Sequence, residues 1–291
     1  MNEWKQPARG FDEISSVFLS STKSGHSMES APHSAPSPRG SPLLFPVSCF
    51  LSPFPAVESF FAGKLAIEIA KNDRTVTLID FGFERSIVRH LLRSSHPEQD
   101  VLLSSETVYP DYKLESLQFR GLPEITLISP AVPPGRNVSE RTLGRIFEED
   151  RVRERDVVLI NSPMGPVEVR IPEMQIPFQR AVVFLDDQIL SLINAYSWIK
   201  QLSRGCLSYL VGAVCGGVEN SGPVPENVPK LQRTIFKHLL GLELRVVQIP
   251  LDQETGLSMQ SGKPPTLVEP SVPSSTAAAI AKLCRNLLRN E

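Results

Sequence analysis

The chain has 291 residues, of which 41% are hydrophobic, and its formal net charge at pH 7 is −2. This length suits one large α/β domain or two smaller domains, and the nearly neutral charge argues against general affinity for nucleic acid. The sequence contains no run of about 18 apolar residues, and its first residues lack the apolar core of a signal peptide. Its four scattered cysteines include no Cys-x-x-Cys pair, which is typical of reduced thiols in a cytoplasmic protein.

Residues 1–44 are predicted to form a disordered tail. Between Thr22 and Pro42 the sequence is rich in serine and proline and poor in aliphatic residues, which is typical of a linker. A short apolar stretch at 11–19 precedes this segment. Its candidate partner-binding residues are Phe11, Ile14, Phe18 and Leu19. On one face of a short helix, these side chains either dock into a partner protein or fold back onto their own domain, because an exposed apolar stripe needs a cover.

Residues 45–291 are predicted to form one α/β domain, which opens with a strand, a helix and a second strand. The apolar run at 46–52 leads into a loop, and apolar residues then recur at every fourth position, which is helical spacing. A β-branched run at 75–79 ends in Asp80. Strands joined by one helix run parallel, and parallel sheets bind ligands at the carboxyl ends of their strands. We therefore expect the loop at 52–60 and Asp80 to share one crevice.

This unit resembles the opening of the MinD/ParA family of P-loop ATPases. That family begins with a strand, a Lys-Gly-Gly-x-Gly-Lys-[Ser/Thr] loop and a helix, and its next strand ends in Ile-Asp-x-Asp. The register is kept here, since Ser52 leads into the loop and Asp80 closes the second strand. The resemblance implies a three-layer α/β fold in which helices flank a mostly parallel sheet.

The phosphate-binding residues of the family's loop are replaced in this chain. Phe54 stands for the first lysine, Glu58 lies beside the glycines, Ser59 stands for the second lysine, and Phe60 stands for the magnesium-binding hydroxyl. A phosphate loop depends on converging N–H groups and on lysine, whereas Pro53 and Pro55 have no N–H. We interpret the loop as a former nucleotide cradle. An ordinary strand-to-helix turn is the alternative.

Two further positions of the family's nucleotide site have changed. The family has a second aspartate two residues after the first, where this chain has Gly82, so that Asp80 is left to cap nearby N–H groups. The run at 157–165 resembles the family's strand followed by Asp-[Ser/Thr]-Pro-x-Gly, with Asn161 in place of the aspartate. A neutral amide supplies no charge for orienting magnesium. The residues that set the loop conformation are kept while the charged one is lost. This pattern favours a protein that keeps the family's fold but has lost its nucleotide chemistry.

The rest of the chain continues the same order of elements. Strands are expected at 101–103, 125–129 and 181–185, with a polar, irregular segment at 104–122 and a helix at 139–147. The stretch at 194–200 is similar to an Asp-Ala-Tyr-x-x-Ile-Lys helix of the MinD/FlhG branch. The strand at 207–215 leads to Gly216, where the family has an adenine-binding asparagine, so the resemblance implies that base recognition is lost as well. A strand at 244–252 closes the sheet.

The helix expected at 275–291 has one apolar and one basic face. It either packs on the sheet or lies peripherally on the anionic inner membrane, and the strength of its apolar face favours packing. We predict no metal site. Asp80, Asp186 and Asp187 could gather at the carboxyl edge of the sheet and bind a cation, but aspartate is common at strand ends for other reasons. His90 and His96 do not have the spacing of metal ligands.

The resemblance covers residues 45–290, and apart from Asp80 every position expected to touch phosphate, magnesium or adenine has changed. We therefore expect a non-catalytic MinD/ParA-like protein without a cofactor, which acts through protein contacts as a bacterial regulatory, assembly or positioning factor. No nucleic-acid partner and no nucleotide-dependent homodimer are expected.

Two alternatives to this function remain open. One is a nucleotide-binding ATPase with an unusual loop that uses ATP and magnesium, in which Lys64 is the only lysine of the first helix. The other is an α/β protein that binds a hydrophobic small molecule in the vacated crevice, lined by Phe54, Pro55 and Phe60.

Overall fold

A computed structural model of the chain describes residues 47–52, 55–81, 101–119, 121–131, 140–163, 179–185, 188–203, 207–217, 224–239, 241–251 and 274–288. All of these belong to one compact unit formed by residues 43–291. The tail predicted at 1–44, with its apolar stretch at 11–19, lies outside the described residues, as do Phe54 and Gly82.

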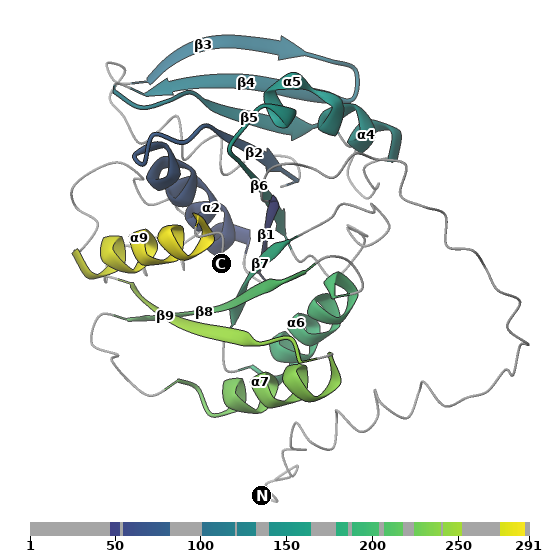
Figure 1. Cartoon of the computed structure of the whole chain (residues 1–291), viewed down its shortest axis with the longest axis vertical. Helices are drawn as coiled ribbons and strands as arrows, with labels where there is room; N and C mark the ends of the chain where they lie inside the picture. The colour runs from purple at the N-terminus through teal and green to yellow at the C-terminus, as the bar shows by residue number, and fades with distance from the viewer. Residues whose placement is uncertain are drawn as a thin grey trace, which may run out of the picture. The chain divides into compact units, whose positions relative to one another are not determined.

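A nine-stranded sheet forms the centre of this unit (Figure 1). Its strands are β1 (Val47–Ser52), β2 (Val76–Asp80), β3 (Val101–Val108), β4 (Tyr112–Phe119), β5 (Ile125–Pro130), β6 (Val157–Pro163), β7 (Arg180–Leu185), β8 (Tyr209–Gly217) and β9 (Leu244–Leu251). They lie in the order β3-β4-β5-β2-β6-β1-β7-β8-β9. Only the β3–β4 and β4–β5 pairings are antiparallel, so β4 alone runs against the other strands. The predicted mostly parallel sheet is confirmed.

The helices of the described residues form the two outer layers. They are α2 (Pro55–Ala70), α4 (Glu140–Glu148), α5 (Asp150–Arg153), α6 (Ile189–Leu202), α7 (Asn227–His238) and α9 (Ser274–Leu288). Figure 1 shows α2 and α9 on one side of the sheet, with α6 and α7 on the other. Because side chains alternate between the faces of a strand, Val211 and Ala213 of β8 pack toward α2 and α9 in the main hydrophobic cluster.

Helix α2 lies at the centre of the hydrophobic core. It packs against β1, β2, β6 and α9, and every residue from Phe60 to Ala70 is buried except Glu68, which is half-buried. A helix that is covered nearly all round needs apolar residues nearly all round, which explains its sequence. Phe61 stacks on Phe184 of β7 with ring centroids 5.0 Å apart.

The C-terminal helix packs on the core. Ile280, Leu283, Cys284 and Leu287 of α9 are buried against α2 and β9, which agrees with the packed arrangement that the sequence favoured. Burial raises the pKa of the Cys284 thiol to about 11, so this thiol is protonated at neutral pH. Within the described residues, no helix is both long enough and apolar enough to cross a membrane.

One segment departs from the sequence prediction. Residues 104–122 were expected to be irregular, but β3 extends to Val108 and β4 occupies most of the remainder. The charged residues of β4 made this strand hard to recognise in the sequence. In the structure Glu115 is fully buried, and its carboxylate lies 3.3 Å from the Lys113 ammonium. Pairing on both sides, with β3 and with β5, completes the backbone hydrogen bonds of this polar strand.

Candidate functional site

The strand order brings the expected site residues to one edge of the sheet. Strand β6 lies between β1 and β2, so that Ser52 at the end of β1 is opposite Pro163 of β6, and Asp80 at the end of β2 is opposite Asn161. The carboxyl ends of three parallel strands therefore meet where the sequence predicted a shared crevice. This edge is where an open α/β sheet binds its ligands.

A buried hydrogen bond joins the two polar residues at this edge. The Asn161 amide Nδ2 donates to the Asp80 carboxylate at 2.9 Å, and the two side chains belong to residues that are 0% and 2% exposed. The backbone N–H of Phe81 donates to the carbonyl of Asn161 at 2.9 Å, which fixes the ends of the two strands together. An amide N–H beside a carboxylate is a favourable contact, whereas two carboxylates at this distance would repel each other.

The position that the sequence resemblance assigns to the magnesium-binding hydroxyl holds an aromatic side chain on the first helix. Phe60 is fully buried and meets Phe61 edge to face, with ring centroids 5.2 Å apart. It packs in the core and offers no surface to a ligand, so it does not line an open crevice as the small-molecule alternative expected. Phe60 also has no oxygen with which to coordinate magnesium.

The other predicted site residues are only partly placed by the structure. Glu58 and Ser59 lie on α2 near its N-terminus. Gly216 lies near the end of β8, opposite Pro250 of β9. Phe54, Gly82, Asp186 and Asp187 lie outside the described residues. Among the described residues, no group of three or more His, Cys, Asp or Glu side chains could hold a metal ion.

Lys64 is a buried basic residue, and its burial was not predicted from the sequence. The residue is 8% exposed, and burial, together with the nearby Lys71 ammonium, lowers its pKa to about 8 although Glu68 acts in the opposite direction. It lies nine residues beyond the start of α2, which is about 13 Å along the helix axis from that start. This distance places Lys64 too deep in the helix to take the role of the usual phosphate lysine.

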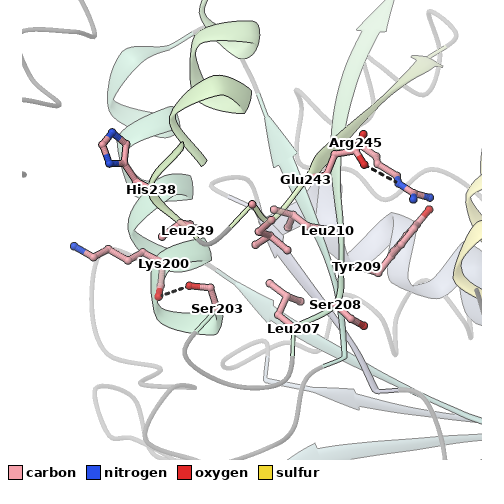
Figure 2. A pocket seen from close by; sticks show the side chains of 12 residues that line it. Lys200, Ser203, Leu207, Ser208, Tyr209, Leu210, His238, Leu239, Glu243 and Arg245 are labelled. Atoms are coloured by element: carbon pink, nitrogen blue, oxygen red, sulfur yellow. Dashed lines mark hydrogen bonds and ion pairs between the residues drawn. The ribbon is translucent and has the colours of Figure 1, made fainter. Parts of the chain in front are cut away.

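A hollow of about 590 Å³ lies at the opposite, amino-terminal edge of the sheet (Figure 2). It is bordered by the last turns of α6 and α7 and by the starts of β8 and β9, and its apolar lining is Leu207, Leu210, Leu239 and Leu242. Figure 2 shows the Lys200 ammonium and the His238 imidazole pointing away from these leucines. Arg245 lies 3.8 Å from Glu243 and stacks over the Tyr209 ring at 5.0 Å. Because Lys200 and His238 point away from the leucines and Arg245 is engaged by Glu243 and Tyr209, the basic side chains do not converge into a binding site for an anion.

The sequence matches no family model and no curated protein. Solved structures do match, and they share one fold. A chain of the MinC:MinD cell division protein complex from Aquifex aeolicus is 18% identical, with a TM-score of 0.53 over 84% of this chain and 96% of that chain. The cell division ATPase MinD from Pyrococcus furiosus is 14% identical, with a TM-score of 0.52 over 82% and 97%.

A ParA family ATPase from Chlorobium tepidum TLS gives a similar result, at 13% identity and a TM-score of 0.50 over 83% of this chain and 98% of that chain. Identities this low establish the arrangement of helices and strands, and they leave the chemistry of the site to be argued from its residues. The chain has the fold of the MinD/ParA P-loop ATPases, as its sequence landmarks predicted.

Proposed function

We propose that this chain is a MinD/ParA-like protein without ATPase activity, which acts as a regulatory, assembly or positioning factor through contacts with other proteins. The hydrogen bond from Asn161 to Asp80 carries the proposal. A magnesium–nucleotide site needs carboxylates whose charge is directed at the cation, and here the remaining carboxylate is buried and engaged by an amide.

The residues of the first helix support the same conclusion. The position of the magnesium-binding hydroxyl holds Phe60, which is part of the core. The only lysine of α2 is Lys64, which lies too deep in the helix for the phosphate role. In sequence, Pro53 and Pro55 remove two of the N–H groups that would converge on a phosphate.

The proposed role in protein contacts is supported by what the similar structures are named as. Two of the three similar structures are named as cell division proteins, one of them in a complex with MinC, and the fold here keeps its sheet and flanking helices. A protein that loses nucleotide chemistry while keeping this scaffold retains surfaces for partners. Peripheral membrane contact through residues 275–291 is disfavoured, because the apolar face of α9 is buried.

Thermal unfolding with and without millimolar Mg-ATP or Mg-ADP tests the proposal. Nucleotide at 100 times its dissociation constant would stabilise the fold by about 2.7 kcal/mol, which raises the unfolding midpoint of a chain this size by several degrees. We expect no shift. A shift of several degrees would overturn the proposal in favour of an ATPase with an unusual loop, and repeating the scan with Lys64→Met would then show whether Lys64 contacts the phosphates.

A further inference from the structure

We propose that this chain self-associates head to tail, through an exposed face of α7 on one copy and an acidic, tyrosine-lined hollow beside α4 and α5 on the next. The α7 face consists of Arg233, Phe236 and Lys237. The hollow, called the tyrosine hollow below, is bordered by Tyr109, Tyr112, Arg145, Glu148, Glu149 and Asp150.

The α7 face combines an exposed aromatic ring with two exposed cations that have no acidic partner among the described residues. Phe236 is 61% exposed, while Val228, Leu231 and Ile235 anchor the opposite side of the helix in the core. Arg233 and Lys237 lie three residues before and one residue after the ring. Within the described part of the chain, neither forms an ion pair, whereas Lys230 on the same helix is paired with Glu226 at 3.2 Å. A large apolar side chain among free cations is typical of a binding surface.

The side chain of Lys200 extends the positive charge of this surface. Figure 2 shows Lys200 at the end of α6 and His238 at the end of α7 both directed away from the leucines of the adjoining hollow. The surface therefore fits a partner that is acidic and offers an aromatic recess.

The tyrosine hollow of the same chain has these properties. It encloses about 380 Å³, and the Tyr109 and Tyr112 rings stack with centroids 4.5 Å apart. The Tyr112 hydroxyl donates to Glu149, and burial with this acceptor raises the pKa of Tyr112, so that the hydroxyl stays protonated. Val108, which immediately precedes Tyr109, is 71% exposed and extends the apolar rim.

Exposed carboxylates give the tyrosine hollow a negative charge that a partner can reach. Glu148 and Asp150 are exposed and, among the described residues, have no basic partner, whereas the nearby Arg145 is engaged by Asp111 at 2.6 Å. We expect Phe236 of one copy to enter between the tyrosine rings and the valine of the next, with Arg233 and Lys237 beside the two free carboxylates. Aromatic contact and cation–π attraction would then add to the ion pairs.

The topology prevents this contact from forming within one molecule. The tyrosine hollow lies by β4, and α7 packs on β9, where the Gln232 amide donates to the Leu244 carbonyl at 2.9 Å. These strands are near opposite ends of the nine-stranded sheet (Figure 1). A contact between two different surfaces leaves one of each free at the ends of every assembly, so it builds open chains and not a closed symmetric dimer, unless the rotation closes a ring.

A charge-exchange experiment on the full chain tests the inference. Sedimentation velocity without nucleotide should show mass that rises with protein concentration in low salt and falls in about 0.5 M NaCl, since exposed ion pairs are screened. Arg233→Glu with Lys237→Glu, and separately Glu148→Lys with Asp150→Lys, should each give monomers. When the two double variants are mixed, each α7 face again meets an oppositely charged hollow, and association should return.

Matched controls separate this contact from unspecific effects. Lys282→Glu with Arg285→Glu makes the same charge change on exposed residues of α9 and should leave association unchanged. Phe236→Ala should weaken association by at least tenfold, and all variants should keep the wild-type unfolding midpoint because the changed residues are exposed. A monomeric wild-type chain, association that survives either charge reversal, or a mixture that stays monomeric would each overturn the inference. Because no nucleotide is present, these results are independent of the Mg-ATP scan.

Discussion

Asn161 joins two neighbouring strands at the carboxyl edge of the sheet through both its side chain and its backbone. Its amide donates to Asp80 inside the protein, and its carbonyl accepts from Phe81, so both the side chain and the backbone hold β2 to β6. An aspartate could make the backbone contact but not the side-chain contact. An aspartate at this position would therefore change the electrostatics of the edge.

Replacing Asn161 by aspartate should be costly. Asn161→Asp puts two buried carboxylates in contact, and we expect the free energy of unfolding at pH 7 to fall by about 3 kcal/mol. A proton shared by the pair relieves the repulsion, so the loss should shrink as the pH is lowered toward about 5. Urea unfolding at several pH values measures both effects.

The exchanged pair is the matched control for this substitution. Asn161→Asp combined with Asp80→Asn restores one amide and one carboxylate, so it should recover most of the lost stability. If the single variant were as stable as the wild type at pH 7, the hydrogen bond could not be what holds this edge together.

Lys64 gives a second prediction at the scale of one residue, with the opposite sign. Its pKa is lowered from 10.5 to about 8, so below pH 8 the folded chain bears the cost of a buried ammonium. Lys64→Met removes that cost and should raise the free energy of unfolding at pH 7 by about 2 kcal/mol. Between pH 8 and 10.5 the unfolded wild type binds more protons than the folded one, so wild-type stability rises with pH there, and the methionine variant should lack this rise.

Lys71 offers the comparison for Lys64, because it lies on the same helix but is exposed, with Glu68 at 2.6 Å. Lys71→Met should change stability by less than about 1 kcal/mol and leave the alkaline pH dependence intact. A loss of stability in Lys64→Met would show that the ammonium is held by a favourable contact and would contradict this account.

At the scale of elements, two glycines should respond in opposite ways to alanine. A methyl group on Gly212 in β8 would lie 2.7 Å from Leu185 Cδ1 and 3.2 Å from Leu244 Cδ1, so two buried leucines on β7 and β9 must shift. Gly212→Ala should destabilise the fold by about 1 kcal/mol. Gly144 in α4 has no such neighbour within 4 Å, and Gly144→Ala should stabilise by about 1 kcal/mol through helix propensity.

Thermal unfolding of the two alanine variants checks this pair, and the sign of each change is the result to read. Equal shifts in one direction would mean that the strands around Gly212 are not closely packed, and that loss of glycine flexibility dominates at both sites.

Elements with strong apolar patterns were predictable from the sequence, and elements with mixed patterns were not. The strands of the central sheet read as β-branched runs because parallel strands are covered on both faces, and β2 is buried at every position. Strand β4 carries Lys113, Glu115 and Gln118 and lacks such a run. Its partners lie in β3 and β5, and this long-range pairing leaves no local signal.

The candidate site was predictable for a related reason. Asp80 and Asn161 each come directly after an apolar run in the sequence, so their place near the carboxyl edge followed from the parallel order. Their hydrogen bond depended on β6 lying between β1 and β2, which only the fold reveals. The burial of Lys64 and the tyrosine hollow had no sequence signal, because each arises from residues brought together by packing.

At the scale of the whole molecule, the role of the segment before the domain can be decided by removing it. Residues 43–291 form one compact unit, and the first described strand begins at Val47. We predict that a chain starting at residue 43 unfolds within about 1 °C of the full chain. This is the outcome if the apolar stretch at 11–19 binds a partner protein, one of the two arrangements that the sequence leaves open.

The alternative, in which this stretch folds back onto the domain, predicts a much larger effect. Burial of two phenylalanines alone would contribute about 3–6 kcal/mol, so losing them should lower the unfolding midpoint by about 10 °C. Phe11→Ser with Phe18→Ser in the full chain should reproduce that loss if the stretch is packed, and should leave the midpoint unchanged if it serves a partner. Because the two outcomes differ by several degrees, one differential scanning experiment on the three chains separates a docking segment from a missing part of the core.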